Sequence, residues 1–456
     1  MTDPTNKTLR WYEGITRYQW LVLVIASLGW VFDVFEGQVF VASMRDAMPA
    51  LLGVAADDPS VTNWNDWAFG SFLLGGALGG VVFGMMSDRV GRSRTMIVTI
   101  LFYSLFTCAT AFAQAPGQMV ALRFLVAMGV GGEWAVASSM VAEVMPQRSR
   151  PVMSSIFHGS SVFGTLLAAA TGAYVVGNPA LGEAAWRWGF AIGALPALLT
   201  VWVRWKLREP DQWVRARERA CTDESQQAGH VVELFYRPHV RNTLVGVALS
   251  SIGLVTFWGA HIYGKNALLR HAQQQALVDD NVPADAPQSA KTKAWAAHAT
   301  QIKRAEMLSM VLNTVGGGLG LVLFGTISNR MGRKGAFVLY HAVAFVMVLV
   351  LFEGLIARGA SAIWLAVALP VFGFFTLGMH AGYAVYFPEL YPTRLRGTGA
   401  GFCFNMGRIA TAVAFFSFGM VTITQEQKAI VLAPLYLVGV VVVLFAQETR
   451  NQALPD

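Results

Sequence analysis

The feature that most constrains this chain is a series of long apolar runs separated by short polar segments. A helix needs roughly 20 apolar residues to cross the hydrocarbon core of a bilayer. Runs of about that length occur at 20–43, 67–86, 95–114, 117–142, 149–175, 186–206, 241–263, 304–327, 335–357, 361–387, 397–420 and 428–447. The sequence therefore predicts an all-α membrane protein with twelve transmembrane helices.

Composition supports this class and argues against a soluble protein. Of the 456 residues, 55% are hydrophobic and only 13% are charged, whereas soluble domains carry about 25% charged residues. The net charge of +7 does not indicate nucleic-acid binding, because the basic residues lie in short segments between apolar runs. The three cysteines (Cys108, Cys221 and Cys403) are far apart in sequence and form no metal-binding or disulfide pattern.

The charges between the runs predict the orientation in the membrane. Every second connection is basic, with Arg89, Arg92, Arg94, Arg148, Arg150, Arg330, Arg333, Lys334, Arg394 and Arg396. The first connection on the other side carries Arg45 against Asp46, Asp57, Asp58 and Asp66. By the positive-inside rule, both termini and the central connection are expected on the cytoplasmic side of the membrane. The membrane is expected to be a cell membrane, such as the bacterial inner membrane. The N-terminal segment lacks the pattern of a cleavable signal, so the first run is expected to remain as a span.

An internal repeat divides the chain into two related halves. The segment SDRVGR at 87–92 recurs as SNRMGR at 328–333, 241 residues later, and the pattern Glu143-x-x-Pro-x-Arg-x-Arg recurs at Glu389, 246 residues later. Duplicated halves with a substrate site between them near the membrane midplane are typical of secondary transporters. We expect an N-terminal six-helix bundle (1–206), a cytoplasmic central loop (207–240) and a C-terminal six-helix bundle (241–456). The second bundle carries a polar extracellular insertion (265–303), for which the sequence indicates no role.

These repeated segments carry a family resemblance over nearly the whole chain. GMMSDRVGR at 84–92 resembles the loop between the second and third helices of the major facilitator superfamily, and GTISNRMGRK at 325–334 is similar to its second copy, with Asn329 where Asp is usual. ALRFLVAMGVGGEW at 121–134 is similar to the fourth helix of metabolite–proton and sialic acid or lactate proton symporters. ELYPTRLRGTGAG at 389–401 resembles those families and, more loosely, sugar porters. The resemblance implies two pseudo-symmetric six-helix bundles, the major facilitator fold.

Two carboxylates in the first span are candidates for proton coupling, because ionisable residues inside a membrane are costly and are usually functional. Asp33 and Glu36 are three residues apart and share one face of the helix. Burial favours a neutral carboxyl group and a nearby cation favours a charged one, which allows proton exchange as the surroundings change. The alternative is permanent pairing with an arginine for assembly.

The fourth span contains Arg123 and Glu133, about 15 Å apart along a helix axis, so they are not expected to pair. The resemblance to proton symporters implies that Arg123 is the partner of Asp33. Glu133 is either a second proton site or a helix-packing group.

The eleventh span contains Arg408 with Asn405 three residues before it. A guanidinium group stays protonated and matches a carboxylate with two parallel hydrogen bonds. Acidic residues are absent between Glu389 and Glu426, so the counter-ion must come from another helix or from the ligand. We therefore take Arg408 and Asn405 as candidate substrate residues; an interhelical ion pair with Asp33, Glu36 or Glu133 is the alternative.

Three further polar residues are candidates for substrate binding. His158 lies among hydroxyl residues in the fifth span and can hydrogen-bond a substrate or titrate near physiological pH. His380 and Tyr383 share a face of the tenth span. His158 could equally be a satisfied polar residue between helices, and aromatic residues on a face such as that of His380 and Tyr383 more often pack than bind.

The repeated cytoplasmic signatures are expected to control conformation and not to touch substrate. Asp88 and Glu143 stand beside arginines at helix ends, where ion pairs can hold the inward face shut. The candidate gating residues are Asp88, Arg89, Arg92, Glu143, Arg148, Arg330, Arg333, Glu389 and Arg394. The alternative is that these charges only set topology.

Together these features predict symport of a small organic acid, such as sialic acid, lactate or an aromatic acid, with protons by alternating access. A proton-coupled sugar or polyol porter is the alternative, and it requires the arginines to have internal partners. A receptor would need a signalling domain, and direct use of ATP would need a Walker-type loop, which the chain lacks. We expect a functional monomer in the lipid bilayer that is not an enzyme and has neither cofactor nor metal.

Overall fold

The structure is a computed structural model that describes residues 10–55, 58–176, 178–193, 195–223, 226–283, 285–419 and 424–456. Asp57, one of the acids of the first connection, lies outside these ranges. The elements of the first half are α1 (Arg17–Leu52), α2 (Pro59–Val90), α3 (Arg92–Thr110), α4 (Pro116–Val144), α5 (Arg150–Gly159), α6 (Ser161–Thr171), η1 (Gly172–Val176), η2 (Pro179–Ala184), α7 (Ala185–Ile192) and α8 (Ala197–Lys206).

The central connection contains α9 (Asp211–Thr222) and η4 (Val231–Phe235). The second half consists of α10 (Val240–Thr256), η5 (Phe257–His261), α11 (Ile262–Gly264), α12 (Ala267–Asp279), α13 (Gln288–Ala297), α14 (Ala299–Leu349), η6 (Val350–Ile356), α15 (Ala362–Gly378), α16 (Ala381–Tyr386), η7 (Phe387–Leu390), η8 (Thr393–Leu395), α17 (Arg396–Gly419), α18 (Gln425–Leu432) and α19 (Pro434–Leu444). The predicted all-α class is confirmed.

Within the described residues, nine helical segments are long and apolar enough to cross a membrane. One of them, Ala299–Ile356, contains both the eighth and the ninth predicted spans. The sixth predicted span corresponds to α7 and α8, and the eleventh to α17. The difference from the predicted number therefore comes from the merged eighth and ninth spans, from the interruption between α7 and α8, and from α17, a continuous helix that is not among the nine segments.

Local sequence signals explain where the helices begin and turn. Thr16 caps α1 and forms a reciprocal capping box with Gln19. The two copies of the repeated signature turn at glycines, Gly91 with φ +125° and Gly332 with φ +84°. A residue with a side chain rarely adopts such a positive φ, so the repeated glycine is required for the sharp turn between consecutive spans.

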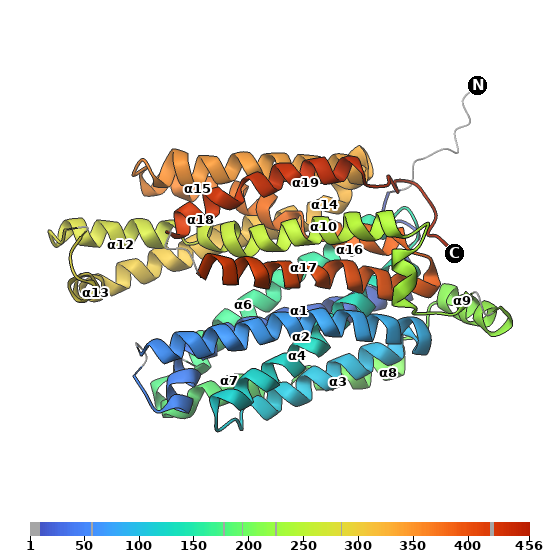
Figure 1. The fold of residues 1–456 in the computed structure, drawn as a ribbon, viewed down its shortest axis with the longest axis horizontal. Coiled ribbons are helices and arrows are strands. Elements are labelled where there is room, and N and C mark those ends of the chain that lie inside the picture. The colour runs from blue at the N-terminus through green and yellow to red at the C-terminus, as the bar shows by residue number, and fades with distance from the viewer. Residues whose placement is uncertain are drawn as a thin grey trace.

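Figure 1 shows two helical bundles lying side by side, with α1–α8 in one and α10–α19 in the other. The helices α12 and α13, from the predicted insertion 265–303, project from one end of the molecule. The opposite end carries α9 and the C-terminus. We call this end the basal end.

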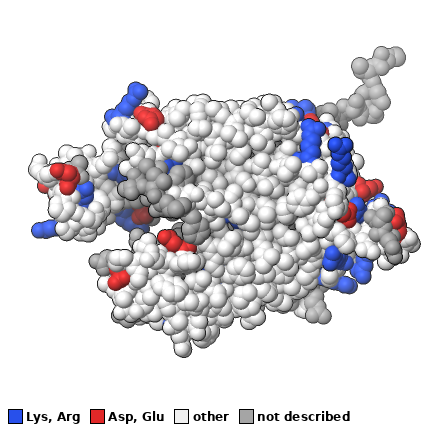
Figure 2. Space-filling model, viewed as in Figure 1, with Lys and Arg blue, Asp and Glu red and all other residues white. Residues whose placement is uncertain are grey.

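The outer surface of the two bundles is apolar. Large hydrophobic side chains are exposed along the helices, including Leu105 at 65%, Leu198 at 70% and Ile363 at 74%. Figure 2 shows a wide uncharged band between two ends where charged side chains gather. Soluble proteins rarely expose apolar patches of this extent, so this band fits the hydrocarbon core of a membrane.

Candidate substrate and proton site

A cavity of about 230 Å³ lies between the two halves. In the first half, its walls are formed by α1, α2, α4, α5 and α6. In the second half, they are formed by α10, η5, α11, α14, α15, the turn between α15 and α16, and α17. Most of the lining is aromatic or aliphatic, with Trp30, Phe40, Phe69, Phe72, Phe257, Trp258 and Phe404 among the aromatic residues. Such a pocket, apolar with a few converging polar groups, is typical of a small-molecule site.

Arg408 on α17 reaches this cavity with an unsatisfied guanidinium group. Its Nη1 is buried and has no hydrogen-bond partner among the described residues. The group lies against α2 at Gly76, where an added Cβ would stand 1.7 Å from Nη1. The absence of a side chain at Gly76 therefore makes room for the guanidinium group.

Asp33 on α1 is the acid that lines the same cavity. It is 1% exposed, and neither carboxylate oxygen has a hydrogen-bond partner of normal geometry among the described residues. Glu133, Arg408, Glu36 and Tyr103 are all close enough to act on its charge. Asp33 and Arg408 thus face a shared space without forming an ion pair with each other.

The predicted pair between Asp33 and Arg123 is wrong. Arg123 pairs instead with Glu36 and also donates to the Thr110 hydroxyl at 2.7 Å. Thr107 donates to the same Glu36 oxygen at 3.2 Å. Both Glu36 and Arg123 are buried and neither lines the cavity, so this pair connects α1 to α4 and leaves Asp33 unpaired.

Glu133 lies inside the first bundle and not on the cavity wall. Its Oε2 accepts a hydrogen bond from Thr99 at 2.5 Å, while Oε1 is buried without a partner among the described residues. Oε1 faces Gly29 of α1, 2.8 Å from where a Cβ would stand. The residue therefore occupies a tight helix contact between α4, α3 and α1.

Three histidines line the cavity. His158 accepts a hydrogen bond from Trp134 Nε1 at 3.2 Å, and the Nε2 of His380 is buried without a partner in the described chain. His261 contacts the hydroxyl of Thr376 at 2.7 Å and the amide of Asn313 at 3.2 Å.

Asn313 on α14 is a cavity residue that the sequence analysis missed. Its Oδ1 is buried and unpartnered among the described residues. The available signal was a polar amide in the otherwise apolar, glycine-rich run MVLNTVGGG.

Two of the predicted substrate residues do not line the cavity. Asn405 donates to the carbonyl groups of Gly401 at 2.9 Å and Gly131 at 3.3 Å, and so fastens α17 to α4. Tyr383 donates to the Leu249 carbonyl at 3.0 Å. Both side chains are buried in the packing below the cavity.

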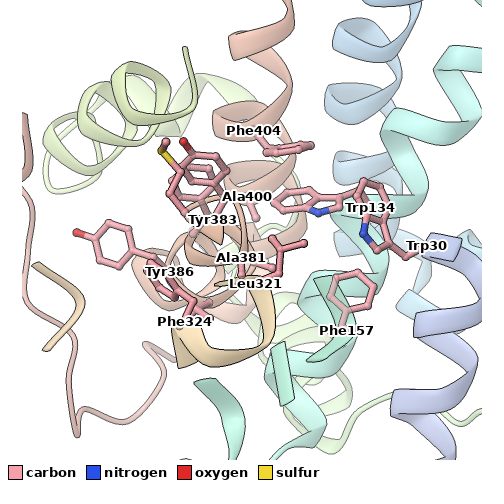
Figure 3. Close-up of a cluster of buried hydrophobic side chains, with 14 of the residues drawn as sticks. Trp30, Trp134, Phe157, Leu321, Phe324, Ala381, Tyr383, Tyr386, Ala400 and Phe404 are labelled. Atoms are coloured by element: carbon pink, nitrogen blue, oxygen red, sulfur yellow. The ribbon is translucent and has the colours of Figure 1, made fainter. Parts of the chain in front are cut away.

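An aromatic layer separates the cavity from the basal end. Figure 3 shows Trp134 of the first half beside Phe404 of the second, with Trp30 on the other side of Trp134. The rings of Trp134 and Phe404 stack with centroids 3.9 Å apart. Phe157, Leu321, Phe324 and Tyr383 continue this layer (Figure 3).

Below that layer, a buried ion-pair network joins the two halves. Arg92 pairs with Asp88 and, at 2.8 Å, with Glu143. Glu143 also pairs with Arg396 of the second half at 2.9 Å. Asp88 accepts hydrogen bonds from the amide groups of Gly397 at 2.9 Å and Thr398 at 2.8 Å.

A duplicated helical membrane protein with a cavity between its halves and this repeated network matches a known family. The model of the Major Facilitator Superfamily matches residues 34–415. The chain belongs to the Major Facilitator Superfamily.

Among the superfamily's members, the chain is 29% identical over 397 residues to an inner membrane metabolite transport protein, YgcS, of Escherichia coli, covering 85% of this chain and 83% of that protein. It is 26% identical over 391 residues to a cis,cis-muconate transport protein of Acinetobacter baylyi, covering 84% of this chain and 85% of that protein. A solved structure of the proton:xylose symporter XylE has the same fold, with a TM-score of 0.72 at 16% identity over 96% of this chain and 98% of that one.

The second copy of the superfamily signature has fewer contacts between the halves. Arg333 pairs with Glu389 at 2.8 Å, and Glu389 accepts a hydrogen bond from Thr449 at 2.6 Å, all within the second half. Arg150, the repeat counterpart of Arg396, donates to the Ala142 carbonyl at 2.9 Å in its own half. Asn329 follows Gly325 by one turn, and Gly325 lies against Pro151 of α5.

Two glutamates that sequence reasoning missed extend the repeat. Glu209 accepts hydrogen bonds from the backbone amides of Arg92 at 2.6 Å and Ser93 at 3.2 Å. Glu448 accepts from the amides of Arg333 at 2.9 Å and Lys334 at 3.1 Å. Each acid caps the helix that follows the turn glycine, where a negative charge is favourable. Both acids lie far along the chain from the helix they cap, so spacing gave no signal.

The remaining candidate gating arginines hold loops at the basal end. Arg89 donates to the Gly229 carbonyl at 3.0 Å, and Arg394 pairs with Glu233 at 2.6 Å, so both fix the central connection. Arg148 donates to the Glu13 carbonyl at 2.5 Å, and Arg330 is exposed.

Proposed function

We propose that this chain is a proton-coupled symporter of a small organic acid. Metabolite transport across a membrane follows from the family, whereas the acid substrate and the proton are our inference. The observation that carries the proposal is that Arg408, which has no ion pair among the described residues, lines an aromatic cavity that Asp33 also lines.

Arg408 is the proposed carboxylate receptor. A buried guanidinium group without a counter-ion is costly, and a bound carboxylate supplies both the missing charge and two hydrogen-bond acceptors. A relative with 26% identity is named for the transport of cis,cis-muconate, which is an organic acid. The sugar or polyol alternative requires internal partners for the arginines, and Arg408 lacks an ion pair among the described residues.

Asp33 is the proposed proton site because it competes with the substrate for Arg408. When Asp33 is charged, its carboxylate attracts the guanidinium group and repels an incoming anion. When Asp33 is protonated, Arg408 is free to receive the substrate carboxylate, so that acid and proton bind together. Release of the proton on the other side of the membrane restores the competition and expels the acid.

The basal network is the proposed gate. Its buried ion pairs and the hydrogen bonds to the first turn of α17 stabilise closure at the basal end, while the cavity lies above the aromatic layer. We propose that the basal end faces the cytoplasm, as the basic connections indicate by the positive-inside rule. Import then requires the network to break and the aromatic layer to separate.

Uptake into proteoliposomes tests this proposal. A panel of labelled organic acids and sugars would be offered with an inward proton gradient and, as the control, with a protonophore that abolishes the gradient. We expect an acid to accumulate only with the gradient. Accumulation of a neutral sugar in preference to every acid would contradict the proposal.

A further inference from the structure

A second cation, Lys265, lines the cavity. Its backbone is held in place, with its amide donating to the His261 carbonyl at 3.0 Å and its carbonyl accepting a hydrogen bond from Ser309 at 2.5 Å. Its side chain is partly buried, and the described residues offer its ammonium group neither an ion pair nor a hydrogen bond. Glu306 is close enough to act on its charge, but Glu306 pairs with Lys303 at 2.9 Å.

Lys265 and Arg408 enter the cavity at different depths. Gly407, next to Arg408, lies against Leu254 of α10, where an added Cβ would be 2.9 Å from Leu254 Cδ1. Lys265 follows Leu254 by eleven residues along the continuous path of α10, η5 and α11. At a rise of 1.5 Å per residue, this separation is roughly 16 Å along the axis. The two flexible cationic side chains therefore reach the cavity from opposite ends.

The lining between these two ends suits a flat apolar body. Phe257 and Trp258 stand on the helical path between Leu254 and Lys265, and Phe69 on α2 packs against Trp258 with ring centroids 5.0 Å apart. Phe40 and Phe72 stack with centroids 5.7 Å apart. Aromatic side chains of this kind pack well against planar unsaturated groups, in offset-stacked or edge-to-face arrangements.

The charges of the cavity decide how many anionic groups its ligand carries. Among the lining residues that the structure describes, Arg408 and Lys265 are the cations and Asp33 is the acid. Once Asp33 takes up the coupled proton, two cations remain without a counter-ion. A monocarboxylate would neutralise one of them and leave the other partly desolvated, which is unfavourable.

We propose that the substrate is a dicarboxylate with a flat, apolar body, with one carboxylate at Arg408 and the other at Lys265. This inference rests on the proposed symport of an organic acid and makes Lys265 a specificity-determining residue. It also assigns a role to one residue of the insertion 265–303.

Two pairs of matched ligands test the proposal on the purified full-length protein at low pH. Each pair exchanges a terminal carboxylate for a methyl group on the same body: trans,trans-muconate against sorbate, and terephthalate against 4-methylbenzoate. We expect the wild type to bind at least one diacid roughly five- to tenfold more tightly than its monoacid. Lys265→Met should remove this preference and change monoacid affinity by less than about twofold. Lys293→Met, which removes an exposed lysine that does not line the cavity, should leave the preference unchanged.

The outcomes separate this inference from the function on which it rests. If the wild type binds the monoacids as tightly as the diacids, or if Lys265→Met weakens both members of a pair equally, Lys265 is not a second carboxylate receptor and the organic-acid function still stands. If folded wild-type protein binds none of the four acids, the flat dicarboxylate is excluded as the substrate, and the organic-acid function is then decided by the uptake panel. If Lys265→Met does not fold, Lys265→Gln and Lys265→Arg are measured in its place. Loss of the diacid preference in Lys265→Gln but not in Lys265→Arg supports the proposal, and the same preference in both variants contradicts it.

Discussion

Asp88 on α2 accepts two hydrogen bonds from Thr398 on α17, from its backbone amide at 2.8 Å and from its hydroxyl at 2.5 Å. The two residues are 310 positions apart and belong to different halves. The carboxylate therefore caps the first turn of a helix in the other bundle, where unpaired amides favour a negative charge. This contact and the pair between Glu143 and Arg396 join the two halves at the basal end, where we propose that they stabilise closure.

Neutralising these acids should open the basal end. Asp88→Asn and Glu143→Gln each leave a buried arginine with less compensation, which is costly. We expect the labelling rate of a cysteine placed at the buried Ser154 on α5 to rise roughly tenfold, since about 1.4 kcal/mol changes a population tenfold. The measurement needs a background in which Cys108 and Cys221 are replaced by serine.

Arg330→Gln is the matched control, because Arg330 is an exposed arginine of the same repeated signature. It should leave the labelling rate unchanged. Unaltered labelling in both acid variants would mean that Asp88 and Glu143 only set topology.

Replacing the proposed proton site should uncouple transport. Asp33→Asn mimics a permanently protonated acid, so Arg408 remains available and binding and exchange of the acid should persist. Accumulation driven by a pH gradient should fall to the level of the protonophore control. Asp66→Asn, which changes an exposed acid of α2, should accumulate substrate normally. An Asp33→Asn protein that concentrates substrate as well as the wild type would exclude Asp33 as the coupling site.

The pair between Glu36 and Arg123 should matter for stability more than for coupling. Glu36→Gln leaves the Arg123 guanidinium buried without its counter-ion, which costs about 3–5 kcal/mol in typical buried pairs. We expect a lower Tm for purified Glu36→Gln protein and partial recovery in the double variant Glu36→Gln, Arg123→Gln. The ratio of protons to substrate should not change in either variant. If Glu36→Gln protein has a normal Tm but loses proton-driven accumulation, Glu36 belongs to the coupling site.

Changes at Arg408 should weaken affinity without a matching loss of stability. Arg408→Lys keeps the charge and loses the two-pronged geometry, so we expect roughly tenfold weaker binding of an acid. Arg408→Ala removes the counter-ion of a buried carboxylate, and we expect a loss of about 100-fold or more. Affinity and Tm should be measured on the same purified samples. Wild-type affinity in well-folded Arg408→Ala protein would exclude Arg408 as the receptor.

The spans and the repeat could be predicted from sequence because both depend on local properties. An apolar run of membrane length specifies a helix regardless of its neighbours. The turn at Gly91 and its copy at Gly332 specify where consecutive spans reverse. The apolar runs did not predict the interruptions of the helices at η5 and η6. At these two places, a π-helical turn changes which face of the helix the following residues occupy.

The arrangement of the charged residues depended on contacts that spacing does not encode. Asp33 and Glu36 share a helix face, so the sequence could not determine which of them meets Arg123. The rotation of α1 decides this, and it directs Glu36 toward α4 and Asp33 toward the cavity. Asn405 was assigned to substrate because it shares a face with Arg408, but the glycine at position 80 allows its amide to lie against α2.

The two copies of the signature have diverged at positions that belong together. The first copy has Asp88 opposite Gly397, whose amide donates a hydrogen bond to the acid at 2.9 Å. In the second copy, the residue after Arg150 is Pro151, which has no amide hydrogen to donate, and the acid is replaced by Asn329. A lone aspartate there would lack one of its donors. Restoring Asp at 329 without Gly at 151 should therefore not create a second set of contacts between the halves like that of Asp88 with α17.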